Sequence, residues 1–476
     1  MHSTAVQLML GLERHKAGDL EQAERIYGEV LAHDPKNADA LHLLGVLASQ
    51  RGKQELALGY LGRAVQLNPA VPFYHGDLGN VLHELGRLSD AVMCYEEALR
   101  LDPECAEAHS NLANTLDRAG RFEDSLAHRL EVVRLRPERA ETYTNLGNTL
   151  RAQSMISEAL VCYGQALAID REDAEAHSGR AITLLLSGDL TAGWREYEWR
   201  WKTSRVPPRA FSVPLWDGSA LAGKTILLHA EQGLGDTLQF VRYVPLAAQS
   251  GGEIVLECQP RLEPLLRRIP EVREVVLAGS PLPAFDVHAP LLSLPRILDT
   301  TAATVPSKVP YLGVSPARVE AWRARIGPVG GQKVGLVWAG SPTYKEDCTR
   351  SLDFRQVEPL LQVPGIRFFS LQKGPAAAEV DRGLPLTPLE EDSNDILDTA
   401  AAILNLDLVI SVDSMVAHLA GALGAPVWTL LPFAPDWRWL LGREDSPWYP
   451  TMRLFRQPRA GDWQAVVARV AEALRA

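Results

Sequence analysis

The spacing of apolar and polar residues follows two patterns along this chain of 476 residues, with the change near residue 200. In the first part, apolar positions recur at helical spacing, and the pattern returns every 34 residues, closed each time by a proline. The prolines are Pro35, Pro69, Pro103 and Pro137, the small residues twelve positions earlier are Ala23, Ala57, Ala91 and Ser125, and the residues eight positions earlier are Tyr27, Leu61, Tyr95 and Arg129. A fifth unit has Arg171 in place of the proline, and a sixth begins at Ala174 and loses the pattern at Gly193 and Trp194. The period predicts about five stacked helix pairs.

Beyond Pro207 and Pro208, short apolar runs alternate with helical segments, which indicates parallel βαβ structure. The predicted strands are 225–230, 254–258, 274–277 and 285–288 in a first set and 334–338, 367–371, 406–411 and 427–431 in a second, with helices at 238–249, 316–326, 354–361, 396–404 and 416–423. A glycine-rich joint at 327–331 separates the sets. Two open parallel sheets joined in this way form a cleft between their carboxyl edges, where ligands bind in such folds.

The composition follows the same division. All 11 tryptophans lie at or after Trp194, and 27 of the 32 prolines lie after residue 200. We therefore expect an α-helical solenoid over 1–205, a first α/β lobe over 206–315 and a second α/β lobe over 316–476. The class is α plus α/β.

Charge and cysteine usage exclude several classes of protein. The net charge is −11, with 22 basic against 30 acidic residues up to residue 206 and 26 against 29 beyond it, so neither part is a basic nucleic-acid surface. The first residues do not form a signal peptide, and no run of 18 apolar residues suggests a membrane span. The five cysteines lack C-x-x-C spacing and are odd in number, which favours buried thiols over a zinc site or disulfides. We expect a cytoplasmic protein.

The 34-residue units carry a further pattern near their start, a Leu-Gly pair as at Leu44-Gly45 and Leu78-Gly79, which becomes Leu112-Ala113 in the fourth unit. Over residues 4 to about 200 the chain resembles the tetratricopeptide repeat family. The resemblance implies a superhelix whose groove holds a peptide or partner protein, the alternative being a spacer between domains. Recurring asparagines on the first helices are candidates for clamping an extended peptide backbone, or else are solvated polar residues: Asn80, Asn111, Asn114, Asn145 and Asn148.

The aromatic run 194–201, which contains Trp194, Tyr197, Trp199 and Trp201, ends the repeats. A terminal repeat must cover its apolar face or dock it onto the next domain, and large rings suit either purpose. We interpret the run as a capping or docking helix, with a sugar-stacking platform as the alternative.

Two loops are candidates for binding chemistry. Gly233 and Gly235 lack the third glycine of a dinucleotide fingerprint, because Leu238 stands there, and no Walker loop is present. After the strand that ends at Ser411, Asp413 and Ser414 are placed to cap a helix whose positive end suits a phosphate or diphosphate, with His418 one turn on. A plain N-cap and a buried structural histidine remain open as alternatives.

The motifs Gly233-Leu-Gly-Asp236, Val337-Trp-Ala-Gly-Ser341 and Asp413-Ser-x-x-x-His418 resemble the heptosyltransferase-like glycosyltransferases of family 9, which have the two-Rossmann GT-B fold, over residues 222 to 476. The resemblance implies a glycine loop at Gly233 and Gly235 and a nucleotide-diphosphate sugar in the C-terminal half. By the same resemblance, Ser341, Lys345 and Arg350 face the phosphates, Gln372 and Lys373 lie near the nucleoside, and Asp413, Ser414 and His418 meet the sugar and diphosphate. The family usually has glycine where Met415 stands.

Sugar transfer requires the charge that develops on the leaving diphosphate to be neutralised. No D-x-D sequence occurs in the chain, which favours stabilisation without metal or cofactor, by Lys345, Arg350 and the helix at Ser414. Inversion also requires a base on the acceptor side. Asp236 is the candidate by resemblance, with helix capping as its alternative role and with Glu231 and His229 in reserve.

Together the halves predict a metal-independent, inverting glycosyltransferase whose repeats hold a protein acceptor. O-GlcNAc transferases, and bacterial enzymes that glycosylate flagellin, share this domain order. One alternative is a non-catalytic scaffold with a degenerate transferase domain, for which Met415 is the best support. Another is a transferase that acts on a lipid-linked or saccharide acceptor. We expect no nucleic-acid partner and no membrane span.

Overall fold

The computed structural model describes residues 4–203, 209–343, 347–380, 383–389 and 395–476. Its packing divides the chain into two compact units, residues 1–173 (unit 1) and 174–476 (unit 2), which are described separately. The expected linker at Pro207 and Pro208 lies outside the described residues. The domain borders expected after residues 205 and 315 stay predictions.

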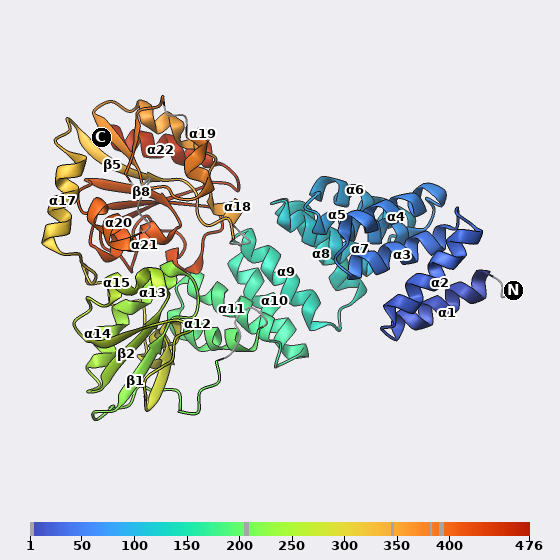
Figure 1. Ribbon diagram of the computed structural model, residues 1–476, viewed down its shortest axis with the longest axis horizontal. Coiled ribbons are helices and arrows are strands. Elements are labelled where there is room, and N and C mark those ends of the chain that lie inside the picture. Colours follow the sequence, from blue (N-terminus) through green and yellow to red (C-terminus); the bar gives the residue numbers. More distant parts are fainter. Residues whose placement is uncertain (1–3, 204–208, 344–346, 381–382, 390–394) are drawn as a thin grey trace. The chain divides into compact units, whose positions relative to one another are not determined.

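Unit 1 consists of helices arranged in consecutive antiparallel pairs, shown from blue to teal in Figure 1. In the described residues these are α1 (Thr4–Lys16), α2 (Leu20–His33), α3 (Ala38–Gln50), α4 (Gln54–Leu67), α5 (Pro72–Glu84), α6 (Leu88–Leu101), α7 (Ala106–Arg118), α8 (Phe122–Leu135), α9 (Ala140–Ala152) and α10 (Ile156–Ile169). The sequence period therefore corresponds to one helix pair per 34 residues.

A glycine on the first helix of a pair receives the large side chain of the second. A Cβ on Gly79 would lie 2.7 Å from a ring carbon of Tyr95. The same close approach joins Gly11, Gly45 and Gly147 to Tyr27, Leu61 and Tyr163, respectively. In the fourth unit both partners change, because Ala113 replaces the glycine and the buried Arg129 replaces the ring. The glycine of the Leu-Gly pair and the residue eight positions before the proline are thus the two sides of one contact between helices.

The turn inside each pair also repeats. Gly18, Gly52, Gly86, Gly120 and Gly188 all have positive φ, between 71° and 94°. At the corresponding place in the fifth pair stands Ser154, with φ 59°, a conformation that a residue with a side chain adopts at a cost.

Unit 2 begins with α11 (Ala174–Ser187), α12 (Leu190–Tyr197) and the short helix η1 (Glu198–Lys202), which carry the predicted aromatic run. Trp194 is 2% exposed, and its ring packs edge-to-face on that of Trp437, with 5.2 Å between centroids. Its ring also contacts those of Phe240 and Trp448, from two different parts of the α/β region. Trp194 therefore packs this run against rings from both lobes of the α/β region within unit 2.

The first sheet of unit 2 is parallel, with strand order β3-β2-β1-β4, and with its helices it forms the first lobe. Its elements are β1 (Thr225–His229), α13 (Leu234–Phe240), α14 (Val244–Ala248), β2 (Glu253–Cys258), α15 (Glu263–Leu266), β3 (Val272–Leu277), β4 (Val287–Pro290) and α16 (Leu294–Ile297). The single helix predicted at 238–249 was wrong: α13 starts earlier, and a 3-10 turn separates it from α14. Pro245, at the start of α14, lacks the N–H that a continuous helix would need. The strand expected at 285–288 lies two residues later.

The second sheet is also parallel, with order β10-β9-β8-β5-β6-β7, and forms the second lobe. When the six strands are numbered in chain order, their order across the sheet is 3-2-1-4-5-6, the arrangement of a dinucleotide-binding sheet. Its elements are α17 (Pro316–Ile326), β5 (Gln332–Val337), α18 (Asp347–Arg350), α19 (Phe354–Val357), β6 (Ile366–Ser370), β7 (Leu386–Pro388), α20 (Ile396–Ile403), β8 (Leu408–Val412), α21 (Met415–Ala422), β9 (Val427–Leu431), η7 (Trp437–Trp439), β10 (Met452–Arg456) and α22 (Trp463–Arg475).

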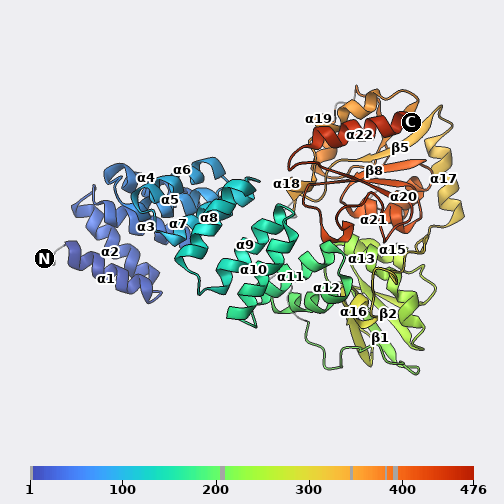
Figure 2. The same ribbon diagram turned by 180° about the vertical axis from the view of Figure 1, so that it is seen from behind.

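Helices cover both faces of this second sheet. Figures 1 and 2 show α19 and α22 on one side of β5 and β8, and α20 and α21 on the other. A core that includes Trp338, Phe354 and Trp463 fills the space beneath α19 and α22. The sequence did not predict β7, β10 or α22. The region after the repeats is nevertheless α/β with parallel sheets, as expected.

Candidate functional site

The carboxyl ends of the central strands define the candidate site. In the first sheet, β1 and β4 are neighbours although they are not consecutive, and in the second sheet the same is true of β5 and β8. At such switch points the loops leave in opposite directions and open a crevice that binds ligands in α/β proteins. The loop from β1 to α13 and the loops after β5, β8 and β9 carry the polar residues described below.

Asp236 is the third residue of α13, directly after the first switch point. Its Oδ2 accepts a hydrogen bond of 2.8 Å from the backbone N–H of Gly233, which precedes the helix. This bond satisfies an N–H at the helix entrance, so Asp236 has a capping function from the third position of α13, whereas the N-cap itself is Gly233 and not Asp236 as the alternative supposed.

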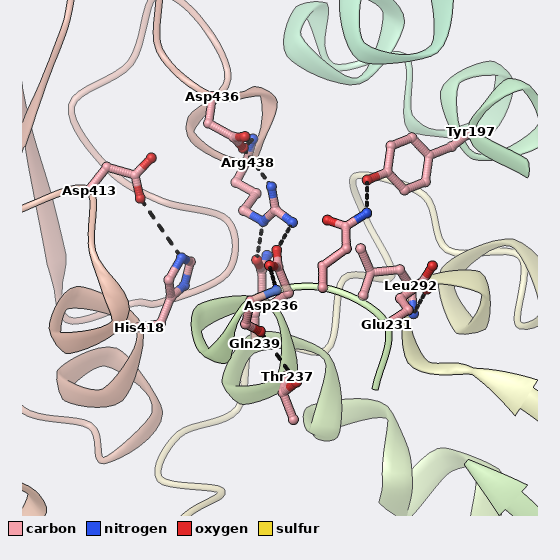
Figure 3. Close-up of polar contacts among 12 residues, drawn as sticks. Tyr197, Glu231, Asp236, Thr237, Gln239, Leu292, Asp413, His418, Asp436 and Arg438 are labelled. Carbon is pink, nitrogen blue, oxygen red and sulfur yellow. Dashed lines mark hydrogen bonds and ion pairs between the residues drawn. The ribbon is translucent and has the colours of Figure 1, made fainter. Parts of the chain in front are cut away.

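The other oxygen of Asp236 forms an ion pair that the sequence did not predict. Arg438, in η7 of the second lobe, donates from Nη2 to Asp236 Oδ1. The guanidinium also donates from Nη1 to Asp436, at 2.9 Å, and from Nε to Gln239 Oε1, at 2.8 Å. Figure 3 shows Arg438 between these partners. The side chains of Arg438 and Asp236 are 8% and 19% exposed, so a largely buried ion pair joins the two lobes.

Asp413 and Ser414 follow β8 at the second switch point. Ser414 is the N-cap of α21, and its Oγ accepts a 3.2 Å hydrogen bond from Val416 N–H. Asp413 precedes the cap and is buried. Burial, followed by the nearby Asp436 carboxylate, raises the pKa of Asp413 to about 6. Of the two predicted capping residues, only Ser414 caps the helix.

His418 is buried in α21 and has protein partners. Its Nδ1 lies 2.9 Å from the Tyr449 hydroxyl, its Nε2 lies 4.0 Å from Asp413 Oδ1, and its ring stacks on Trp439 at 5.2 Å. Burial, and then the charge of Arg438, lower the pKa of His418 well below its ordinary value. The imidazole is therefore neutral at pH 7.

Gly235 allows the two lobes to approach at this place. A Cβ on Gly235 would lie 2.8 Å from His418 Cδ2, so α13 and α21 cross without room for a side chain there. The expected glycine loop thus contributes close helix packing at Gly235, while Gly233 supplies the N–H that Asp236 accepts.

The remaining residues that the sequence predicted to bind the nucleotide-sugar donor lie around β5 and β6. Gln372 is buried and uses its whole side chain internally: its Oε1 accepts from the N–H groups of Trp338 and Ala339, and its Nε2 donates to the carbonyls of Ala339 and Lys373. Ser341 Oγ lies 2.8 Å from Thr343 Oγ1. Lys345 lies outside the described residues.

Two cationic side chains, Arg350 and Lys373, complete the set of residues predicted to bind the nucleotide-sugar donor. Arg350 Nε donates to Asp347 at 3.0 Å, and the Arg350 charge is close enough to oppose the rise in the pKa of Asp413. Lys373 Nζ lies 3.4 Å from Thr399 Oγ1. The structure thus brings Asp236, Asp413 and His418 into one cluster around Arg438 and places Arg350 near it, whereas Gln372 shapes the β5 loop.

The two reserve candidates for the base are occupied elsewhere. Glu231 is buried against Arg200 of η1, which donates to both of its oxygens at 2.8 and 2.9 Å. His229 Nε2 lies 3.3 Å from His288 Nδ1, and burial, then Arg209, lower the pKa of His229 to about 3. Tyr197 accepts a 3.2 Å hydrogen bond from Gln232, so the docking segment holds the loop that leads to Asp236 (Figure 3).

The asparagines of unit 1 separate into two groups. Asn80, Asn114 and Asn148 occupy one repeat position, and each carboxamide oxygen accepts a hydrogen bond from the second helix of its own pair. The donors are Tyr95 Oη at 2.8 Å, Arg129 Nη2 at 2.7 Å and Tyr163 Oη at 2.8 Å. These three oxygens fix the helix pairs.

Asn111 and Asn145, at the second repeat position, line a hollow of about 180 Å³ between α7, α8 and α9. Arg129, Arg136 and Arg139 line the same hollow. Asn111 donates to Asn80 Oδ1 at 2.9 Å, while Asn145 makes no side-chain hydrogen bond within the described part of the chain. Of the five predicted asparagines, Asn111 and Asn145 are the two that line this hollow.

Comparison with known proteins identifies the repeats. A model of the TPR repeat matches residues 79–120, and models of the tetratricopeptide repeat match residues 8–72 and 104–172. The N-terminal region therefore consists of tetratricopeptide repeats. Within the residues that the structure describes, no helix has both the length and the apolar character of a membrane span.

The chain is also similar to Protein FlbA of Caulobacter vibrioides, with 33% identity over 324 residues. The match covers 62% of this chain and 54% of FlbA, so the chain spans about half the length of that curated relative. Because unit 1 has only 173 residues, the similarity extends into unit 2.

Solved structures overlap a smaller share of the chain. MamA is 22% identical with a TM-score of 0.33, covering 36% of this chain and 94% of MamA. YrrB, described as a TPR protein with an unusual peptide-binding site, is 20% identical with a TM-score of 0.33, covering 36% and 88%. PilF of Pseudomonas aeruginosa is 19% identical with a TM-score of 0.38, covering 42% and 90%.

Arg438 and Arg200 are the residues that the sequence interpretation missed. The available signal was an arginine between two tryptophans, Trp437 and Trp439, and another between Trp199 and Trp201, since cations in aromatic surroundings are often buried and paired. Their partners, Asp236 and Glu231, lie far away in the chain, and no local pattern joins them.

Proposed function

We propose that this chain is a glycosyltransferase that moves a sugar from a nucleotide-diphosphate donor to a protein or peptide acceptor held by the tetratricopeptide repeats. The observation that carries the proposal is the cluster at the carboxyl edges of two parallel sheets, where Asp236 of the first lobe meets Arg438 of the second beside the N-terminus of α21. A carboxylate on one side and a cation with a helix end on the other suit, respectively, an acceptor hydroxyl and a leaving diphosphate.

The proposed reaction is a single displacement. The acceptor hydroxyl attacks the anomeric carbon and gives its proton to Asp236, while the bond from that carbon to the diphosphate oxygen breaks. The electron pair leaves on the nucleoside diphosphate, whose charge is balanced by cationic side chains and by the N–H groups of α21, without metal. Asn111 and Asn145 are the proposed contacts to the acceptor backbone, in the manner of a peptide-binding repeat protein.

A nucleotide titration tests donor binding. All 11 tryptophans lie at or after Trp194, so intrinsic fluorescence reports on unit 2. UDP, GDP, ADP, CDP and CMP should be titrated in turn, and one nucleoside diphosphate should quench or shift the emission with saturation. Absence of a response to all of them would remove the donor half of the proposal.

Transfer itself is tested on Asp236 and on the repeats. Asp236→Asn should abolish the mass increase of acceptor proteins while nucleotide binding is retained, and retained transfer would exclude Asp236 as the base. Asn111→Ala with Asn145→Ala should weaken modification of a protein acceptor but leave donor hydrolysis unchanged. The exposed Asn68, at the end of α4, provides the matched Asn68→Ala control.

A non-catalytic scaffold is the second candidate. It is favoured by the internal hydrogen bonds of Gln372 and His418, which already satisfy two residues expected to meet the donor. A scaffold would bind a partner through the repeats and bind no nucleotide. The titration therefore distinguishes the two functions before any acceptor is known.

A further inference from the structure

Arg438 and Asp236 are bonded to one another at the place where the proposed reaction needs both side chains. The guanidinium donates from Nη2 to Asp236, from Nη1 to Asp436 and from Nε to Gln239, so each of its three nitrogens has a partner. Both oxygens of Asp236 are also in use, one by Arg438 and one by Gly233 N–H. In this arrangement the carboxylate has no free oxygen directed at an acceptor proton.

The partners of Arg438 differ in how firmly they belong to it. Asp436 Oδ1 accepts from the backbone N–H of Arg438 as well as from its Nη1, both at 2.9 Å, so this carboxylate is a local anchor at the N-cap of η7. Asp236 belongs to the other lobe, 202 positions away in the chain. Loss of the contact to Asp236 would thus leave the guanidinium anchored beside η7 and the carboxyl edge of the second sheet.

The side chain of Gln239 also indicates that the contact between Arg438 and Asp236 is one of two arrangements. Gln239 Oε1 is held by Arg438 Nε, while Gln239 Nε2 is buried and has no hydrogen-bond partner among the described residues. A buried donor without a partner carries the cost of its desolvation, so an arrangement that gave Gln239 Nε2 a partner would be favoured. Movement of Arg438 would release Gln239 to rearrange.

Charge decides which partner an approaching ligand would displace. Asp236 and Asp436 each accept a hydrogen bond from the one guanidinium of Arg438, so two carboxylates already share this cation. A diphosphate that approached this place would therefore compete with a carboxylate for the guanidinium. A diphosphate has more charge and more acceptor oxygens than a carboxylate, and arginine binds phosphate groups in a bidentate manner.

We propose, on the basis of the proposed function, that Arg438 is a donor-operated switch: a nucleoside diphosphate draws the guanidinium from Asp236 to its own phosphates and thereby frees Asp236 to act as the base. Arg438 is then both a donor-binding residue and the group that masks the base before donor arrives. The reaction becomes ordered, with donor before acceptor. No covalent bond changes in this step.

The switch predicts opposite effects for the two halves of one ion pair. Asp236→Asn removes the competitor, so nucleoside diphosphate affinity should rise several-fold. Arg438→Gln removes the ligand, so affinity should fall at least tenfold, and the double variant should resemble Arg438→Gln. If the ion pair were merely structural, both variants would lose affinity for the nucleoside diphosphate, or both would keep it.

The experiment is isothermal titration calorimetry of the full chain with the nucleoside diphosphate that binds best and with the matching monophosphate. The Arg438→Gln defect should be large for the diphosphate and small for the monophosphate, whereas a folding defect would weaken both equally. Arg443→Gln is the matched control, because Arg443 forms an exposed pair with Asp445 in the same region and should leave affinity unchanged. If Arg438→Gln does not fold by circular dichroism, Arg438→Lys retains the charge without the fork and should show an intermediate loss.

The outcomes separate the two claims. If the wild type binds no nucleoside diphosphate, the proposed function fails and the switch fails with it. If the wild type binds one but Asp236→Asn does not tighten it, the switch alone is refuted. Tightening by Asp236→Asn together with a diphosphate-specific loss in Arg438→Gln would support the switch.

Discussion

A substitution at Gly79 measures the helix contact that repeats along unit 1. Gly79 and Gly76 lie one turn apart on α5, so the same change, glycine to alanine, can be made twice in one helix. A Cβ on Gly76 would have no atom within 4 Å, whereas a Cβ on Gly79 would lie 2.7, 2.9 and 3.0 Å from three ring carbons of Tyr95. The pair isolates packing from helix propensity.

The magnitudes follow from these distances. Alanine in place of glycine in a helix interior gains about 1 kcal/mol, and Gly76→Ala should stabilise by up to that amount. Gly79→Ala has the same gain but requires the Tyr95 ring to move by roughly 0.8 Å to reach carbon–carbon contact distance. That ring is 1% exposed, and its hydroxyl donates to Asn80, so the shift should cost about 1–3 kcal/mol, as in other overpacked cores.

The expected difference between the two variants is therefore about 1–3 kcal/mol, because helix propensity cancels. Hydrogen exchange of the α5 and α6 amides in the full chain measures it locally, which suits a repeat array with nearest-neighbour stability. Tryptophan fluorescence of unit 2 should stay unchanged and serves as an internal control. In a Tyr95→Ala background, Gly79→Ala should become stabilising. Equal protection of α5 by Gly76→Ala and Gly79→Ala would refute the reasoning.

Three further predictions concern single positions. Ser154→Gly should raise the stability of unit 1 by about 0.5–1 kcal/mol, because φ is 59° there, and unchanged thermal unfolding by circular dichroism would contradict it. Arg200→Met should destabilise unit 2 by about 3–5 kcal/mol, since it leaves Glu231 buried without its ion pair. Urea unfolding followed by tryptophan fluorescence should show most of that loss recovered in Arg200→Met with Glu231→Met, and no recovery would count against the ion pair. Burial raises the pKa of Asp413 in the folded state to about 6, above its ordinary 3.8, so its contribution to stability is present at low pH and lost as pH rises through 6. The wild type should therefore gain stability relative to Asp413→Asn as pH falls from 7 to 5 in the same unfolding assay, and a pH-independent difference would contradict this assignment.

The repeat pattern could be predicted because it is local. Each helix pair is built from positions a fixed number of residues apart, such as Gly79 and Tyr95, and each pair packs mainly on the next. The same locality explains why strands β1, β2 and β8 were predicted within two residues: each is a short apolar run bounded by turn residues. Strand β10, which alternates apolar residues with Arg453, and the short β7 carried weaker signals.

The candidate site shows where local reasoning ends. Asp236, Asp413 and His418 were chosen from motifs, and the structure places them in one cluster. The ion pairing and protonation of these residues could not be predicted, because they depend on Arg438, a residue whose partners come from two lobes. Gln372 was expected beside a nucleoside and instead holds the β5 loop through four hydrogen bonds.

The sequence by itself determined the repeats, the parallel α/β character of the remainder and the residue types at the strand ends, since these depend on spacing along the chain. Only the tertiary structure decided that Arg438 holds Asp236, that Gly235 makes room for His418 and that Arg200 holds Glu231. Burial and charge arise from neighbours that are distant in the chain. The strength of an ion pair and the pKa of a carboxyl group depend on those neighbours, so the side chains that control the proposed chemistry become visible only once the chain has folded.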